Sequence, residues 1–431
     1  MENQILHDLH SCCEKALYEL YPAGIPCEIS QRFEREMHCL MKRPGCLDNF
    51  LLFKEISDAA KQTCGKIYLA GTITNSILVY LLGDHELNPM PAHYYCPHCG
   101  YYHEQPKTVV GLDLPEETCP HCGTVLRKDG FSLREEYVWK NSTGPDFEYR
   151  ITARILPLVH KIIEQHYAKQ QLHTALLGLE NVDNKLKASG IVIFPSGKRI
   201  VDYYEFSGTT YDGKDCLCYD WQLFDKGDLK KILLLQTDVL DVLDAMQWKI
   251  GVLADSITAN TFTDVSCQDI FNASVLHGED CQIFNKIKPT TFREKMDLIT
   301  ATHNTYQELD NNDLSIRFAE NPLFLSCPIY TRDDAYDMLR AIYKDADKAF
   351  LDAENIRKGR LRHSRYVLDP AVPESFKAIV RHIGYLFPRA FGQWYMLQYM
   401  RLSQYQKLDR NAYYNVIRRE KLAFSITERT L

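Results

Sequence analysis

Two closely spaced pairs of cysteines constrain the fold of this chain more than any other feature. Cys96 and Cys99 lie in a C-P-H-C-G segment, and Cys119 and Cys122 lie in a second copy of it. Four thiolates at this spacing can surround one zinc ion, which favours soft sulfur ligands in a tetrahedron. Because four cysteines leave no ligand position for water, the predicted zinc is structural. Two redox-active dithiols, or four unrelated cysteines, are the alternatives, and the repeated spacing favours zinc over both.

The residues around the cysteine pairs resemble a known family. Residues 88–95 read N-P-M-P-A-H-Y-Y, residues 111–115 read G-L-D-L-P, and a threonine precedes the second pair. The zinc segment of PolC, the DNA polymerase III α subunit of Gram-positive bacteria, reads N-P-x-P-x-H-Y-x-C-P-x-C, then G-x-D-L-P, then T-C-P-x-C-G. The resemblance implies an α+β, family-C polymerase-like core with a nucleotidyltransferase-like palm, a zinc module and mostly helical fingers.

The resemblance extends over nearly the whole chain and implies five consecutive segments. They are the N-terminal helices and start of the palm (1–94), the zinc-binding module (95–130), the remainder of the palm (131–255), a palm-to-fingers connection (256–325) and a helical fingers-like domain (326–431). The domains that precede the palm in PolC, and the parts that follow its fingers, are expected to be missing. Part of the palm–thumb region is also expected to be deleted.

Local patterns predict the elements that carry these segments. Apolar residues at three and four spacing predict helices within residues 14–62 and a further helix over 151–178. Residues 65–69 and 187–195 read as strands, the second of them buried. A helix through 242–246 is expected to end at Gly251.

Two of the three metal-binding carboxylates of the PolC palm have counterparts here. Asp146 and Glu148 fall where PolC carries P-D-I-D, but the second acid is one methylene longer. Ile232 or Leu233 stands in place of the third carboxylate, depending on a one-residue shift of the alignment with the family segment. We predict that Leu233 holds this position. Because two-metal catalysis needs carboxylates aimed at one point, the resemblance predicts no catalytic residue, only vestigial Asp146 and Glu148. An exposed acidic turn is the alternative for this segment.

Two other nucleotide-handling features of PolC are altered. Of its phosphate-binding G-R-G-S-S turn, only Gly71, Thr72 and Ser76 remain, and Leu69 stands in place of the arginine. A plain helix cap is therefore the better interpretation of these residues. In the fingers, Phe391 replaces the family's histidine.

Positive charge is concentrated near the C-terminus. Residues 357–419 contain thirteen Lys or Arg and three acids, although the net charge of the chain is −7. Together with interleaved aromatic residues, this composition favours a surface that pairs with phosphates and stacks on bases. Two amphipathic helices with basic outer faces and an aromatic core stripe are the alternative. The candidate nucleic-acid-binding residues are Arg357, Lys358, Arg360, Arg381 and Arg389.

The remaining composition bounds the compartment and the partners. A sequence pI near 6.1 argues against a dedicated nucleic-acid binder. No apolar run suggests a membrane span, and no signal peptide is evident, so no membrane partner is expected. Fifteen cysteines without a secretion signal predict reduced thiols in a bacterial cytoplasm.

The combined pattern predicts a catalytically inactive PolC-like protein, a pseudo-polymerase. It would act as a DNA- or replisome-binding accessory or regulator of DNA replication, with structural zinc as its cofactor. One alternative is a minimal active DNA-directed DNA polymerase that uses magnesium, Asp146, Glu148 and a substitute acid such as Asp220 or Asp238. Another is a zinc-stabilised protein-interaction module without a nucleic-acid role.

Overall fold

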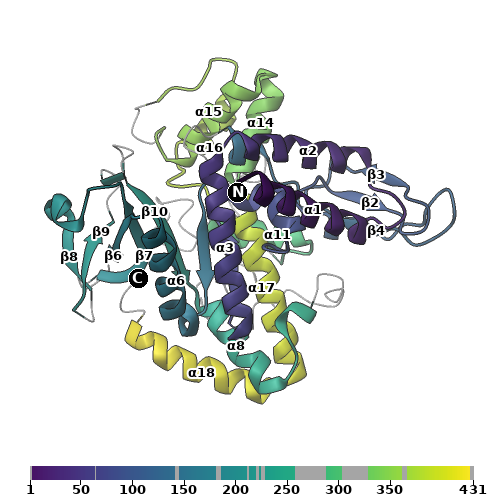
Figure 1. Cartoon of the computed structure of the whole chain (residues 1–431). Helices are drawn as coiled ribbons and strands as arrows, with labels where there is room; N and C mark the ends of the chain where they lie inside the picture. Colours follow the sequence, from purple (N-terminus) through teal and green to yellow (C-terminus); the bar gives the residue numbers. More distant parts are fainter. Residues whose placement is uncertain are drawn as a thin grey trace. The chain divides into compact units, whose positions relative to one another are not determined.

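Long helices and two β-sheets make up the described part of the chain (Figure 1). The computed structural model describes residues 2–63, 65–140, 145–180, 186–210, 213–219, 223–224, 229–257, 288–302, 329–361 and 366–427. The α+β fold class expected from the sequence is confirmed. The expected palm-to-fingers connection falls mostly outside the described residues, and α11 (Phe292–Thr302) is the main element described within it.

The chain divides into two compact units that alternate along the sequence. The first unit comprises Met1–Met37, Thr74–Ser142 and Ile257–Gln404. The second comprises His38–Ile73, Thr143–Ser256 and Tyr405–Leu431. The five consecutive segments expected from the resemblance therefore do not coincide with these units, and they stay a prediction.

The second unit is built on a seven-stranded mixed sheet. β10 is parallel to β5, and β9 is parallel to β6, while the other neighbouring strands are antiparallel. Alternate residues of β10 are buried, which is the period-two pattern of a strand. The strands, in sheet order, are β1 (Ile67–Ala70), β5 (Glu148–Ile151), β10 (Lys230–Gln236), β7 (Leu186–Phe194), β6 (His173–Glu180), β9 (Asp215–Cys218) and β8 (Ser207–Thr209).

Two helices of this unit, α3 (Pro44–Gln62) and α6 (Leu156–Lys169), pack on each other. Phe53 of α3 stacks on Tyr149 of β5, with ring centroids 5.5 Å apart. The buried residues of α6 recur at three and four spacing, so one helical face is apolar. The helix predicted over 151–178 is thus shorter, because α6 ends at Lys169 and β6 begins at His173.

Two further helices complete the second unit, α8 (Asp238–Ile250) and α18 (Arg410–Thr427), which contact each other. Thr237 caps α8 by accepting the amide N–H of Leu240. Gly251 ends the helix with φ of 79°, in the left-handed region that favours glycine, as the sequence predicts.

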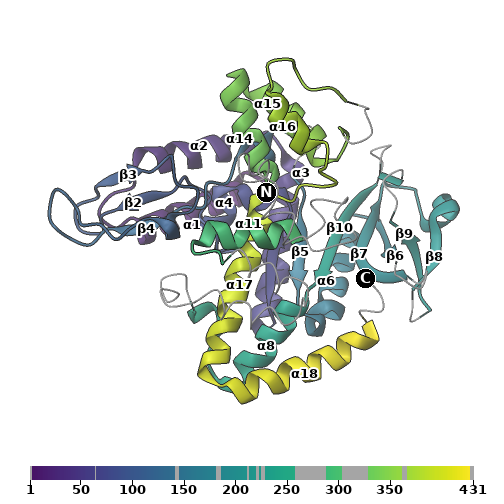
Figure 2. The ribbon, with the colours of Figure 1, turned by 180° about the vertical axis from the view of Figure 1, so that it is seen from behind.

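The first unit contains most of the helices and the small sheet β3-β2-β4. Within it, α14, α15 and α16 lie close together (Figure 2). They share an apolar core that includes Tyr336, Ile356 and Ile379. Its elements are α1 (Glu2–Leu20), α2 (Cys27–Met41, in its larger part), α4 (Ile77–Leu81), β2 (His93–Tyr95), β3 (Tyr102–Glu104), β4 (Arg127–Asp129), α5 (Glu136–Trp139), α11, α14 (Arg332–Tyr343), α15 (Ala346–Arg357), α16 (Glu374–Val380) and most of α17 (Arg389–Leu408).

Short 3-10 turns connect several of these elements. They are η1 (Thr72–Asn75), η2 (Gly111–Asp113), η3 (Ala153–Ile155), η4 (Ile200–Phe206) and η5 (Ala254–Ser256). No helix in the described ranges combines the length and the hydropathy that crossing a membrane would require.

Candidate metal centre and polymerase-like site

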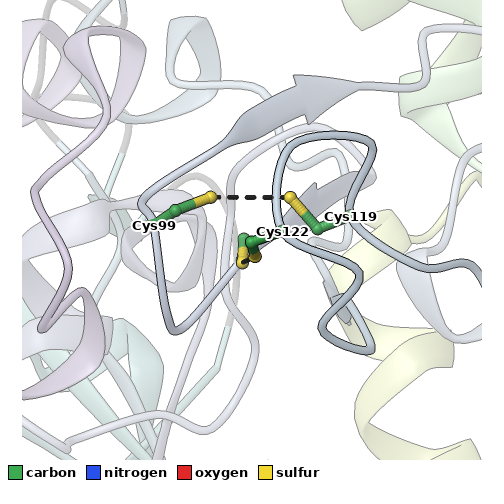
Figure 3. Close-up of side chains that lie close together, drawn as sticks. Cys99, Cys119 and Cys122 are labelled. Carbon is green, nitrogen blue, oxygen red and sulfur yellow. Dashed lines mark hydrogen bonds between the residues drawn. The ribbon is translucent and has the colours of Figure 1, made fainter.

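The four predicted zinc ligands converge on one point. Their sulfur atoms all lie within 4.8 Å of one another. The Cys96–Cys122 and Cys99–Cys119 sulfur pairs are each separated by 3.5 Å, and Figure 3 shows Cys99 and Cys119 pointing toward each other, with Cys122 close by. Four thiolates that bind zinc at about 2.3 Å lie about 3.8 Å from one another. The cluster therefore fits a tetrahedral zinc ion.

Each cysteine pair sits on a tight turn that a glycine closes. Gly100 and Gly123 have φ of 76° and 74°, which few residues other than glycine adopt. Their amide N–H groups donate to the carbonyl oxygens of Cys96 and Cys119, at 3.0 and 2.9 Å. A Cβ on Gly100 would also lie 2.6 Å from the carbonyl oxygen of Ala23. Both turns thus hold their sulfur atoms in a fixed arrangement.

The zinc module has a small core of its own. Cys96 and Cys119 are buried and pack with Ala92, Leu114 and Leu126, while the other two cysteines are exposed. A core this small stabilises little by itself, so the metal is expected to contribute much of the local stability.

Asp113, from the G-L-D-L-P segment, joins the zinc module to α11. Its carboxylate accepts hydrogen bonds from the amide N–H groups of Phe292 and Arg293, at 2.6 and 2.9 Å. These are the first residues of α11, so Asp113 acts as a helix cap from a distant part of the sequence. Burial raises the pKa of this carboxyl group. The motif residue therefore has a structural role that its sequence position alone did not reveal.

The register of the large sheet brings the palm remnants together. Glu148 on β5 pairs with Leu233 on the parallel strand β10 and with Ala70 on β1. Paired residues in a sheet share a face, so Leu233 stands beside Glu148 where the predicted third carboxylate would be. Ile232 lies on the opposite face and is 3% exposed, because successive side chains alternate. Of the two candidates, only Leu233 pairs with Glu148, and its assignment to the third carboxylate position stays a prediction.

Asp146 precedes β5 and has an exposed side chain. Its backbone N–H donates to Thr72 Oγ1 at 2.8 Å, and its carbonyl oxygen accepts from the amide of Ile73 at 3.3 Å. A Cβ on Gly71 would lie 2.5 Å from that carbonyl oxygen. The turn at 71–73 therefore binds the backbone of the strand beside it. Ser76 is the N-cap of α4, as the helix-cap alternative predicts.

The other acids close to β10 in the sequence do not complete a metal site. Asp244 forms a two-oxygen contact with the guanidinium of Arg154, at 3.1–3.2 Å, and Asp241 accepts the amide of Ala153 at 2.8 Å. Asp238 is the first residue of α8, and Asp220 lies outside the described residues. With Leu233 beside Glu148, the described residues do not fit a pair of magnesium ions, which need several carboxylate oxygens at one point.

The five predicted nucleic-acid-binding residues differ in exposure. Lys358, Arg360 and Arg381 are exposed. Arg357 is half-buried and donates to Glu354 and to the hydroxyl of Tyr385.

Arg389 departs from the prediction, because it is 1% exposed. Its guanidinium donates to Asp334, Asp337 and the carbonyl oxygen of Ser132, at 2.8–3.1 Å. A side chain enclosed in this way does not present its charge to a phosphate. We therefore assign Arg389 a structural role.

Comparison with known proteins identifies the relatives of this chain. DNA polymerase III PolC-type of Caldanaerobacter subterraneus is 23% identical over 473 residues, which covers 93% of this chain and 33% of that protein. Those of Thermotoga petrophila and Bacillus subtilis are 23% and 24% identical and cover 92% of this chain in each case. The chain is PolC-like. It spans about a third of the length of these relatives, and no protein-family model matches it.

The alignment with the Caldanaerobacter protein is longer than this PolC-like chain itself. That relative therefore contains insertions within the matched region. The shortening expected between the palm carboxylates and the strand at 187–195 stays a prediction. The mixed sheet and the zinc module of the PolC-like chain both lie in the matched region, which covers nearly all of it.

Sequence reasoning missed two buried charge networks of the PolC-like chain. In one, Asp334 joins Arg293 and Arg389 in the first unit. In the other, Glu36 accepts hydrogen bonds from Arg32 and from Ser76, and burial raises its pKa. Thr331 and Asp334 form a capping box at α14, which is the one local sequence signal that could have placed an acid there.

Proposed function

We propose that this chain is a catalytically inactive PolC-like protein that acts as a DNA- or replisome-binding accessory or regulator of DNA replication. One observation carries the proposal of inactivity, namely the pairing of Leu233 with Glu148 on adjacent parallel strands. Two-metal phosphoryl transfer requires carboxylates that clamp the attacking and leaving oxygens. An aliphatic side chain at the third position supplies neither charge nor a ligand atom.

Two further observations support the loss of nucleotide transfer. The turn at 71–73 uses the amide of Ile73 to bind the carbonyl oxygen of Asp146, whereas a phosphate cradle needs inward-facing amides for the ligand. Glu148 also places its carboxylate one methylene farther from the strand than an aspartate would. Because an electrostatic site depends on several groups positioned together, these changes are expected to act jointly.

A role in binding DNA is supported by the exposed cations Lys358, Arg360 and Arg381 and by the similarity to DNA polymerases. None of the eleven described cysteines forms a disulfide, and we place the protein in a reducing compartment, the bacterial cytoplasm, as part of the proposal. The net charge of −7 favours a second candidate function, a zinc-stabilised module that binds a replisome protein without contacting nucleic acid.

Primer extension tests the proposal directly. The full chain is incubated at high concentration with a primed template, deoxynucleotides and either magnesium or manganese, beside an Asp146→Ala variant. We expect no template-directed synthesis by either protein. Synthesis that Asp146→Ala abolishes would instead establish the minimal polymerase that uses Asp146, Glu148 and a substitute acid. Synthesis that survives the substitution would indicate a contaminating enzyme and would call for repurification before the result counts.

A further inference from the structure

Four half-buried aromatic side chains form a continuous ladder that runs from the segment before α17 into its first turns. They are Tyr385, Phe387, Phe391 and Tyr395. Successive ring centroids lie 4.9, 4.4 and 4.7 Å apart. Phe387 and Phe391 are stacked, whereas the contacts at either end of the ladder are edge-on or tilted. Edge-on and tilted contacts cover less of each ring face than stacking does.

Other aromatic residues of α17 are buried in the core. The sequence alone did not distinguish them from the partly exposed rings of the ladder. Trp394 is fully buried and Tyr399 is 1% exposed, so these side chains belong to the core of the first unit. Trp394 contacts Tyr395 edge-on at 5.0 Å, which supports the ladder from the inner side. The helix therefore has an aromatic core face and, beside it, a row of rings that remains partly exposed.

A basic edge adjoins the first ring of the ladder. The amide of Leu386 donates to the carbonyl oxygen of Arg357, at 3.1 Å, which fixes the 357–360 turn against the ladder segment. The guanidinium of Arg357 lies 5.4 Å from the centroid of the Tyr385 ring and donates to its hydroxyl.

Gly359 makes this close approach possible. It has φ of 62°, and a Cβ there would lie 2.5 Å from the carbonyl oxygen of Gly384. Lys358 and Arg360 are exposed on the same turn, and Arg381 is exposed four residues before Tyr385. Three exposed cations are thus brought to one end of the aromatic ladder.

We infer that the ladder and this basic edge form a track for single-stranded DNA. The inference rests on the proposed DNA-binding function and names its ligand. Cations at one end neutralise phosphates, while partly exposed rings offer faces on which unpaired bases can stack. In duplex DNA the base faces are stacked inside the double helix. A duplex can therefore pair its phosphates with the cations but cannot stack its bases on the aromatic rings. Single strands are therefore the ligand for which both halves of the surface are suited.

The test measures the binding of the full chain to a fluorescent oligothymidylate and to a hairpin duplex of equal length, by anisotropy over a series of salt concentrations. Phe391→Leu and Tyr395→Leu keep apolar volume but remove the aromatic face. Each is expected to weaken single-strand binding about tenfold, since one base–aromatic stack is worth roughly 1–3 kcal/mol. Neither should change the salt slope, because no phosphate contact is lost.

Charge and stacking are separated by a second set of variants. Replacing Lys358, Arg360 and Arg381 together by glutamine should reduce the salt slope by about 2, since each phosphate contact contributes about 0.7 on a single strand. Tyr204→Leu is the matched control, because Tyr204 is 77% exposed but lies in the second unit. An oligonucleotide that carries 2-aminopurine reports stacking itself, and its fluorescence change should be lost in the ladder variants alone.

Three results would overturn the inference. Ladder variants that bind like the wild type, with an unchanged 2-aminopurine signal, would make the rings mere packing and leave DNA binding intact. A preference for the duplex would contradict single-strand recognition. If the wild type binds neither DNA at low salt, the track and the DNA-binding part of the proposed function both fail, while catalytic inactivity is still decided by primer extension.

Discussion

Leu233 and Glu148 are register partners on two parallel strands. A hydrophobic side chain therefore stands beside the Glu148 carboxylate, at the position where a second carboxylate could share a metal ion with Glu148. The neighbouring position cannot substitute for it, because Ile232 faces the opposite side of the sheet. Of the proposed changes, this one concerns a single side chain on the continuous β1-β5-β10 arrangement. It can therefore be tested by a single substitution.

Leu233→Asp is expected to create a divalent-cation site in the second unit. Glu148 and the new carboxylate would then lie on paired strand positions, with Asp146 two residues before Glu148, and hard cations prefer such oxygen ligands. We expect manganese to bind at least about tenfold more tightly than to the wild type, as followed by electron paramagnetic resonance.

Leu235→Asp is the matched control for that substitution. It adds the same charge on the same strand and face, but opposite Arg150 instead of Glu148. Equal manganese binding by the two variants would show that added charge alone, and not the register, explains any gain.

Zinc removal is expected to unfold the zinc module. Cys119→Ser replaces a buried ligand, and coupled binding and folding at such sites can reach about 10 kcal/mol. The wild type should contain about one zinc ion per chain by metal analysis, and the variant should contain less and melt at a lower temperature. Cys27→Ser, at an exposed cysteine outside the cluster, should change neither quantity. A metal-free wild type of normal thermal stability would refute the zinc assignment.

Features that depend on local spacing could be predicted from the sequence. The zinc cluster follows from two short repeats whose turns are closed by their own glycines. The strand predicted at 187–195 corresponds to β7, and the helix end predicted at Gly251 is confirmed. The helix prediction over 151–178 failed after Lys169. A turn with Gln171 at φ of 60° ends α6 there, and the prediction includes the apolar residues of the following strand, β6, in the helical pattern.

Features that depend on distant partners could not be predicted. Sequence counts Arg389 as a basic residue of the fingers, but its acidic partners lie more than fifty residues earlier on α14. The choice between Ile232 and Leu233 needed the register of β10 against β5. In both cases the deciding contact joins elements that are far apart in the chain, so no local pattern encodes it.

Arg389→Met is expected to destabilise the first unit by about 3–5 kcal/mol, because it removes one partner of a buried ion pair. Burial alone would raise the pKa of Asp334, but Arg293 and Arg389 hold it well below its usual range. Without Arg389, the buried carboxylate of Asp334 loses one of the two positive charges that offset its cost of burial. Urea unfolding should show the loss, and Arg381→Met, at an exposed arginine, should change stability by about 0.5 kcal/mol or less. Similar effects of the two substitutions would contradict a structural role for Arg389.

The last prediction concerns a histidine of the second unit that two acids enclose. The side chain of His166 on α6 lies 3.0 Å from the carboxylate of Asp48 and 3.4 Å from that of Glu55, both on α3. The hydrogen bond with Asp48 raises the pKa of His166, and the same bond lowers the pKa of Asp48. The charged pair therefore stabilises the packing of α6 on α3.

The stability of this pair depends on pH in a defined direction. A histidine whose pKa is raised on folding stabilises the folded state fully at pH values below its unfolded pKa of about 6.5. This stabilisation is lost as pH rises through the folded pKa. Asp48 stabilises the folded state at pH values above its unfolded pKa, and this stabilisation is lost as pH falls through its lowered folded pKa. His166→Gln should therefore cost about 1 kcal/mol or less at pH 6 and progressively less at higher pH. Thermal unfolding between pH 6 and 9, compared with His103→Gln at an exposed histidine, measures the difference, and a pH-independent cost would show that His166 acts by packing alone.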